Sequence, residues 1–322
     1  MSETVTMEAC SEARSKLEGL KENIHKVIIG NGHTIDMVIT TLVAGGHVLL
    51  EDTPGTGKTT LARVLAKSID GKFSRIQFTP DLMPADITGL NIYSKKEEAF
   101  VFIEGPIMTN ILLADEINRA TPRTQAALLE AMQEEQVTVD GTSRALGQPF
   151  MVIATQNPIE TVGTFPLPEA QLDRFAVQLA MGFPSPEEEA AILNRFGEED
   201  PAKHVVPVIT TQEIVEIREM AKRVKVHPDL VQYMVAIVNA TRNHSAILTG
   251  ASPRASLFLQ TIAKAHALCC GRNYVLPEDI KPLAADVLTH RIQFYSTTDR
   301  SSKLELIQGL LDRISVPSED FS

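Results

Sequence analysis

Residues 49–60 read Leu-Leu-Glu-Asp-Thr-Pro-Gly-Thr-Gly-Lys-Thr-Thr, and no other stretch constrains the architecture of this chain as strongly. The apolar start predicts a buried strand, the glycines predict a turn, and the periodicity of residues 58–69 predicts a helix. Glycine at 55 and 57 lets backbone N–H groups converge on phosphate oxygens, and a helix N-terminus adds partial positive charge. The stretch is therefore predicted to be a phosphate-binding loop.

Individual residues of this loop are expected to have distinct roles. We expect Lys58 to reach the β and γ phosphates of a nucleotide and Thr59 to ligate Mg²⁺. Asp52 stands where the strict motif has glycine, but the part of the motif from Gly55 to Thr59, which contacts the phosphates and the metal, is matched. The expected nucleotide contacts are Pro54, Gly55, Thr56, Gly57, Lys58, Thr59 and Thr60.

A second motif, Ile111–Glu116, is an apolar strand that ends in two carboxylates. We expect Asp115 to hold Mg²⁺ through water and Glu116 to orient or deprotonate the water that attacks the γ-phosphate. An isolated acidic pair would more simply cap a strand before a loop. The presence of Lys58 in the same chain favours the hydrolytic interpretation.

A third motif, Val152–Pro158, is a buried strand with a polar amide at its end. Asn157 is expected to position water, although turn formation before Pro158 would also explain it. Carboxyl ends of parallel strands share one edge of a sheet. Glu51, Asp115 and Asn157 are therefore predicted to face one crevice.

Apolar runs that alternate with helical patterns predict an α/β fold with a five-stranded parallel sheet. Two inserted hairpins are predicted at residues 92–103 and 137–146, and Asp140-Gly141 is a strong type I′ turn signal in the second. The predicted strands are His47–Glu51, Phe73–Phe78, Ile111–Asp115, Phe150–Thr155 and Phe175–Ala180, and the predicted covering helices are Lys58–Ile69 and Thr124–Glu134.

Prolines at 184 and 186 end the strand pattern and mark a domain boundary. Ser185 and Glu188 form a predicted capping box, and further helix starts follow at Thr210, Pro228, Ser252 and Pro277. We therefore predict an N-terminal helical segment over residues 1–27, a nucleotide-binding α/β domain over 28–184, and a smaller all-helical lid domain with a C-terminal tail over 185–322.

Composition excludes several classes of protein. The 322 residues carry 41 acidic and 30 basic side chains, a net charge of −11, which disfavours a nucleic-acid-coating surface. Only three cysteines occur, at 10, 269 and 270, without the spacing of a disulfide framework or a zinc site, so a cytoplasmic location is expected. The eight histidines are scattered singly and are assigned no chemistry. No signal peptide or membrane-spanning run is expected.

Several motifs together resemble the MoxR family of AAA+ ATPases. The resemblance is ordered, covers most of the chain from about Ile28 to Arg291, and is far more specific than the phosphate loop alone. The segments that carry it, besides that loop, are Ala114–Arg119, Gln125–Glu134, Ala154–Pro158 and Leu167–Phe175.

The resemblance implies a ring of subunits, usually hexameric, with ATP bound between neighbours. It implies that Arg174 is the arginine finger, Arg254 the second sensor in the lid, and Asn157 the first sensor. It also implies that the segment with Ile29 lies beside the adenine. From the residues alone, a surface salt bridge would be the simpler explanation of both arginines. Arg119 and Arg123 are weaker candidates for contacts across the subunit boundary.

The function that follows is a Mg²⁺-dependent ATP hydrolase that remodels or matures protein partners, often ones with a von Willebrand factor A-type domain. One alternative is a nucleotide-dependent scaffold with little turnover. Another is a DNA-dependent motor, suggested by the two hairpins. Balanced charges at Lys95, Lys96, Glu97 and Glu98 disfavour nucleic-acid threading.

Overall fold

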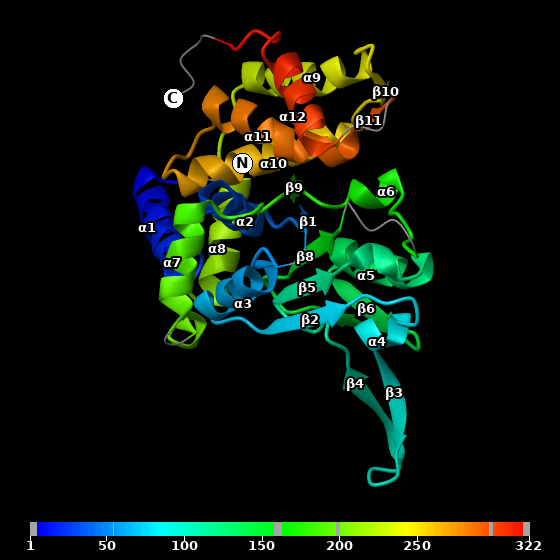
Figure 1. The fold of residues 1–322 in the computed structure, drawn as a ribbon. Coiled ribbons are helices and arrows are strands. Elements are labelled where there is room, and N and C mark those ends of the chain that lie inside the picture. Colours follow the sequence, from blue (N-terminus) through cyan, green and yellow to red (C-terminus); the bar gives the residue numbers. More distant parts are fainter. Residues whose placement is uncertain (1–4, 54, 158–162, 198–199, 296–298, 318–322) are drawn as a thin grey trace.

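A five-stranded parallel sheet forms the centre of the molecule, as predicted (Figure 1). The computed structural model describes residues 5–53, 55–157, 163–197, 200–295 and 299–317. Strand ends differ from the predicted ones by at most two residues. In spatial order the strands are β2 (Phe73–Gln77), β5 (Ile111–Asp115), β8 (Met151–Gln156), β1 (Val48–Glu51) and β9 (Val177–Leu179).

Alternate residues of the strands enter two apolar cores, one on each face of the sheet. Val48 and Leu50 face one core, whereas Leu49 between them faces the other. Successive side chains of a strand point to opposite faces, so β1, β5, β8 and β9 are buried on both sides, whereas the edge strand β2 is only partly buried. The first core includes residues of α1 (Met7–His25), α2 (Gly32–Ala44) and α3 (Lys58–Ser68), and the second includes residues of α5 (Pro122–Glu134).

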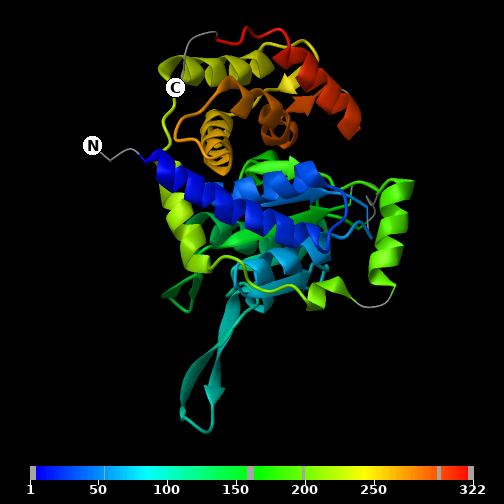
Figure 2. The ribbon, with the colours of Figure 1, turned by 90° about the vertical axis from the view of Figure 1, so that its left-hand side faces the viewer.

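Both predicted hairpins are present. Asp140 and Gly141 have φ angles of 49° and 76°, which is the positive-φ geometry predicted for the second hairpin. The first hairpin extends far from the body, on the side opposite the C-terminal helices (Figures 1 and 2). It comprises β3 (Gly89–Ser94) and β4 (Ala99–Glu104) and follows α4 (Pro84–Thr88), and the second comprises β6 (Gln136–Val139) and β7 (Thr142–Ala145).

The region after Pro184 is helical, as predicted. Ser185 and Thr210 each accept a hydrogen bond from the glutamate N–H three residues later. The predicted capping box at Ser185 is therefore confirmed, and the helix that starts after Thr210 has one as well. The sequence did not predict one short antiparallel pair, β10 (Ile247–Thr249) with β11 (Gln293–Phe294). The helices are α7 (Pro186–Phe196), α8 (Thr211–Lys222), α9 (Pro228–Arg242), α10 (Pro253–Cys269), α11 (Lys281–Leu288) and α12 (Arg300–Leu311).

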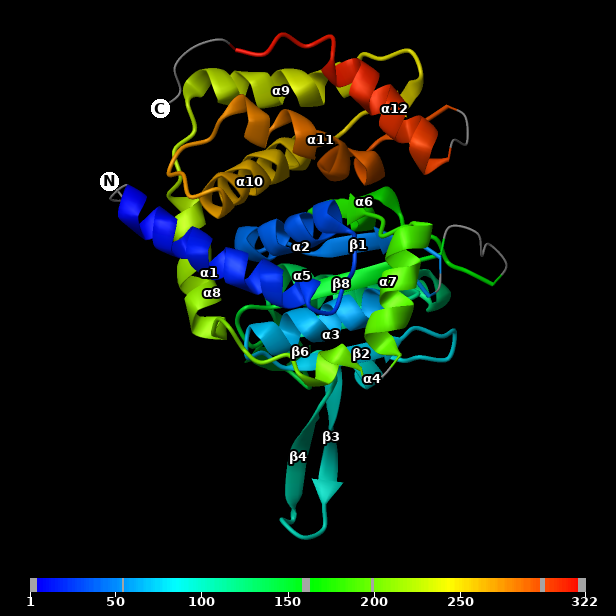
Figure 3. The ribbon, with the colours of Figure 1, turned by 60° about the vertical axis from the view of Figure 1, so that its left-hand side comes forward.

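These helices do not all form a separate layer. α9 to α12 stack above one side of the sheet domain, whereas α7 and α8 lie along the sheet domain itself (Figure 3). α10 packs against α2 and α8, and its Leu259 and Ile262 join the same apolar core as α2 and α3. The domain boundary near residue 184 stays a prediction. Among the described residues, no helix combines the length and apolarity needed to cross a bilayer.

Candidate active site

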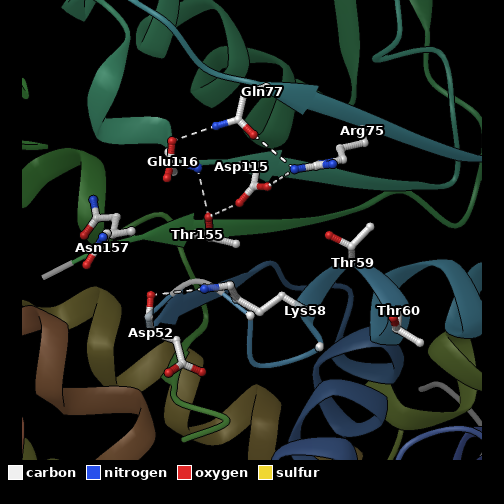
Figure 4. A pocket seen from close by; sticks show the side chains of 13 residues that line it. Asp52, Lys58, Thr59, Thr60, Arg75, Gln77, Asp115, Glu116, Thr155 and Asn157 are labelled. Atoms are coloured by element: carbon white, nitrogen blue, oxygen red, sulfur yellow. Dashed lines mark hydrogen bonds and ion pairs between the residues drawn. The ribbon is translucent and has the colours of Figure 1, made fainter. Parts of the chain in front are cut away.

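A polar cavity of about 260 Å³ opens at the carboxyl ends of β1, β5 and β8 (Figure 4). Lys58, Thr59, Asp115, Glu116 and Asn157 all line it. The predicted convergence of the three motifs is therefore observed. Further lining residues are Asp52, Gly55, Gly57, Thr60, Arg75, Gln77, Thr155 and Gln156, whereas Pro54 lies outside the described residues.

The phosphate loop has the backbone that its glycines predict. Gly55 and Gly57 have φ angles of 90° and 93°, a region that other residues avoid. α3 begins at Lys58, and the first N–H groups of a helix have no partner within it, so they remain available to an anion. The Lys58 ammonium donates to the carbonyl oxygens of Asp52, at 3.1 Å, and Thr53, at 2.8 Å. It is thereby held across the loop, beside the cavity.

Asp52, the departure from the strict motif, anchors the loop. Its buried carboxylate accepts hydrogen bonds from the N–H groups of Met181 at 2.9 Å and Gly182 at 3.2 Å, just beyond β9. It also accepts one from Thr53 N–H at 3.0 Å. A glycine could make none of these bonds, so Asp52 fixes the loop to the neighbouring strand.

Asp115 is paired within the chain in a way that the sequence did not predict. Its Oδ2 lies 2.6 Å from Arg75 Nη2 of β2, and its Oδ1 accepts from the Thr155 hydroxyl at 2.7 Å. Thr155 Oγ1 in turn accepts from Glu116 N–H at 2.8 Å. These contacts join the ends of three adjacent strands. The alternating pattern of residues 73–77 indicates a strand, but it does not indicate which strand lies beside it. The pairing of Arg75 with Asp115 therefore could not be predicted.

Glu116 sits at the strand tip with a left-handed backbone, φ 55°. Its Oε2 accepts from Gln77 Nε2 at 2.7 Å and from Arg119 Nη1 at 2.9 Å. Two donors therefore hold the carboxylate at the cavity wall. The role of Gln77 was not predicted from the sequence. Arg119 contacts Glu116 of its own chain, and its contact with a neighbouring subunit stays a prediction. Arg123 lies exposed in the first turn of α5.

A smaller apolar cavity, of about 150 Å³, adjoins the phosphate loop and contains Ile29. It shares Thr56 and Thr60 with the loop region. Ile192 and Phe196 of α7, a helix that follows the sheet strands in sequence, also line this cavity. Its mostly apolar lining suits a purine base. The sequence resemblance identified Ile29 but not the α7 residues.

Arg174 and Arg254 lie together, but not in the cavity of Lys58. Both line a cavity of about 250 Å³ with residues 45–47, which directly precede β1. They are therefore at the amino ends of the strands, while the phosphate loop is at the carboxyl ends. The strand β1 alone separates the two ends by about 13 Å at 3.3 Å per residue.

Asp173 links these arginines to the C-terminal helices. Its carboxylate lies 2.7 Å from Arg291 Nε and 3.9 Å from Arg254 Nη1, and it accepts from the Ser252 hydroxyl at 3.0 Å. Burial lowers the pKa of Arg291 to about 10, opposed by the adjacent Asp173 charge. No sequence pattern predicts this cluster, because its members are far apart along the chain.

The prediction that Glu51 faces the same crevice as Asp115 and Asn157 is wrong. Glu51 accepts from Gln178 Nε2 at 2.8 Å and lines a different cavity. The cause is the pleat of the sheet. Side chains two residues apart in a strand point to the same face of the sheet. Glu51 therefore points, like Leu49, to the face that α5 covers, whereas Asp115 points, like Leu113, to the face that α3 covers. Two carboxylates at one sheet edge can therefore point to opposite faces.

Comparison with protein families finds two matches. Residues 47–177 match the model described as "ATPase family associated with various cellular activities (AAA)", and residues 239–308 match the AAA lid domain. The first match contains every polar residue named above at the cavity of Lys58. The second contains Arg254 and Arg291.

Similar proteins cover nearly the whole chain. Chaperone MoxR1 of Mycobacterium tuberculosis is 41% identical, with 93% of this chain and 85% of that protein covered. The uncharacterized protein YeaC of Bacillus subtilis is 48% identical, with 89% of each covered. The crystal structure of a "putative ATPase" from Cytophaga hutchinsonii is 38% identical and has a TM-score of 0.88. The match covers 97% of this chain and 98% of that chain.

Proposed function

Because this chain belongs to the MoxR family of AAA ATPases, we propose that its subunits form a ring, bind Mg²⁺ with ATP, and use hydrolysis to remodel or mature protein partners in the cytoplasm. The observation that carries the proposal is the separation of Arg174 and Arg254 from Lys58 at opposite ends of the sheet. A finger arginine in that position needs the nucleotide of another subunit.

The donors at the cavity fit Mg²⁺. The Thr59 hydroxyl and the Asp115 carboxylate are both oxygen ligands, which this hard cation prefers. Bound Mg²⁺ supplies positive charge beside the phosphate oxygens. When Mg²⁺ binds, the Asp115 carboxylate would leave Arg75 and turn toward the metal. Its hydrogen bond from the Thr155 hydroxyl would keep it oriented.

The chain's own groups divide the remaining work. Lys58 would turn from two backbone carbonyls to the phosphates. Glu116 would take a proton from the attacking water, and Gln77 and Arg119 would hold its carboxylate in place. Asn157, on the same wall, would orient that water.

The position of the two arginines supports a ring. One surface of the subunit carries Arg174 and Arg254, and a different surface carries the nucleotide cavity. Contact between two unlike surfaces is heterologous, and such contacts produce closed rings when the rotation closes. The guanidinium fork suits phosphate oxygens. The ring size we propose is six, as the resemblance implies.

The projecting hairpin supports a protein partner rather than nucleic acid. Phe100 is 73% exposed and Tyr93 56% exposed on its strands, and Ile92 is exposed beside them. Exposed apolar patches are typical of protein interaction sites. The DNA-motor alternative needs clustered positive charge, which the balanced lysines and glutamates of the hairpin tip do not supply.

Lys58→Ala is expected to weaken ATP binding by about tenfold to a hundredfold, because the phosphates lose a charged donor. Calorimetric titration of the nucleotide measures the effect. Lys96→Ala, on the exposed hairpin turn, serves as the matched control and should bind ATP normally. Equal ATP affinity in both variants would contradict the role of Lys58.

Client capture tests the remodelling role. A Glu116→Gln chain with ATP should retain partner proteins that turnover normally releases, whereas a Lys58→Ala chain should retain few. Phe100→Ser, combined with Glu116→Gln, should lower capture while ATP binding stays unchanged. If the same proteins bind all three variants equally, with and without ATP, the proposed nucleotide-coupled remodelling is wrong.

A further inference from the structure

A cluster of reactive side chains lies at the C-terminal end of α10. His266 Nδ1 lies 2.7 Å from Asp279 Oδ1, and Cys270 Sγ lies 4.0 Å from His266 Nε2. Arg272 donates to both carboxylate oxygens of Asp279, each at 2.6 Å. The order thiol, imidazole, carboxylate is the arrangement in which a base activates a nucleophile and a third group orients the base.

The carboxylate determines what the imidazole can do. Asp279 is fully buried and accepts from His266 on one ring nitrogen, so the other nitrogen faces the sulfur. Burial opposes the charge on His266, but the hydrogen bonds with Asp279 and Cys270 raise its pKa to about 9. The bond from His266 lowers the pKa of the Cys270 thiol. The contact between the two side chains therefore shifts the equilibrium toward thiolate and imidazolium.

Cys270 lines a cavity of about 120 Å³. Cys270 is half-buried, and residues of α1, α2 and α10 line the cavity. The helices α1 and α2 both pack against α10 (Figure 3). The charged groups that face the cavity from the other two helices are Glu18 and Lys21 of α1 and Asp36 of α2, and Lys21 and Asp36 form an ion pair of 2.7 Å. Arg14 of α1 packs against Gly271 beside it.

ATP hydrolysis does not account for the cluster. None of its described residues lines the cavity of Lys58 or that of Arg174. The backbone does not favour a thiolate either, because Cys270 caps the C-terminus of α10, where the helix dipole is negative. The side chains of His266 and Arg272 must therefore provide the stabilising positive charge.

We propose that Cys270 is a modification site for peroxides, with His266 as its proton donor and Asp279 as the group that orients His266. The thiolate sulfur attacks one peroxide oxygen, an S–O bond forms, and the O–O bond breaks. The departing oxygen takes the proton from His266 Nε2 and leaves as water or an alcohol. The sulfur loses two electrons to the peroxide and becomes a sulfenic acid.

The other two cysteines of the chain are internal controls. Cys10 is completely buried in the core. Cys269 lines the same cavity as Cys270, but burial raises its pKa to about 12, so it stays a neutral thiol at neutral pH. Neither should react at neutral pH while the protein is folded. One protein sample therefore contains one activated thiol and two inert ones.

The rate of alkylation by iodoacetamide tests the activation. Sulfur displaces iodide in this reaction, and peptide mass spectrometry reports each cysteine separately. At pH 7 an ordinary thiol is about 3% ionised, so full ionisation raises the rate by at most about thirtyfold. We expect Cys270 of the folded chain to react about tenfold faster than Cys270 of the urea-unfolded chain, with Cys10 and Cys269 protected.

Two variants and one peroxide assay complete the test. His266→Asn should move the pH profile of Cys270 alkylation to higher pH, and Asp279→Asn should do so less strongly. Hydrogen peroxide followed by dimedone should label Cys270 alone. Lys58→Ala should leave all these results unchanged, which separates this proposal from the proposed ATPase mechanism. Equal alkylation of Cys270 in folded and unfolded chains, or retained zinc that blocks alkylation until chelated, would overturn the proposal.

Discussion

Glu116→Gln is expected to bind ATP as tightly as the unmodified chain and to release phosphate at least about a hundredfold more slowly. The amide matches the carboxylate in shape, and its oxygen can still accept from Gln77 and Arg119. The amide cannot take a proton from water at neutral pH, so binding and turnover are separated by a single change.

Steady-state phosphate release and nucleotide titration, measured on the same preparation, test this separation. Glu130→Gln, which changes an exposed glutamate of α5, is the matched control and should keep normal turnover. Unaltered phosphate release by the Glu116→Gln chain would leave the nucleotide-dependent scaffold as the better account. Lost ATP binding would instead mean that the contacts of Gln77 and Arg119 need a carboxylate to hold the cavity open.

Arg174→Ala is expected to keep ATP binding and to lower turnover by about a thousandfold or more, as when an arginine finger is removed. Its position at the amino ends of the strands gives the reason, because the finger would act only on the nucleotide of a neighbour. Arg254→Ala should lower turnover in the same way, since Arg254 lies in the same cavity. Arg313→Ala, on the exposed C-terminal segment, should be unchanged.

Mixed rings test whether Arg174 acts between subunits. Each Arg174→Ala subunit keeps Glu116, and each Glu116→Gln subunit keeps Arg174. In a random equal mixture, about one quarter of the interfaces pair an intact cavity with an intact finger, so turnover should recover toward about a quarter of normal. Turnover that stays at the level of the separate variants would show that Arg174 is not shared between subunits.

The cluster around Asp173 connects this prediction to the lid. Ser252, Arg254 and Arg291 all come from the C-terminal helical region, and all three contact the residue that precedes Arg174. The residue next to Arg174 is thus held by the C-terminal helices as well as by the sheet domain. A movement of these helices relative to the sheet would therefore move Arg174 and Arg254 together.

Local sequence was sufficient for features that depend on neighbouring residues. The glycine turn before Lys58, the capping box at Ser185 and the Asp140-Gly141 turn each depend on a few consecutive residues, and all three occur as predicted. The five parallel strands follow from short apolar runs between helical patterns. The convergence of Lys58, Asp115 and Asn157 follows because parallel strands end at a common edge.

Only the tertiary structure determined which side chains meet across that edge. Arg75 pairs with Asp115 because β2 lies beside β5, and Glu51 turns away because its position in the pleat faces the other side. Arg174 lies far from Lys58, and His266 lies beside Cys270 and Asp279, through packing between elements separated along the chain. Short-range patterns indicate the type and approximate ends of most elements, whereas strand order, pleat direction and helix packing determine their contacts.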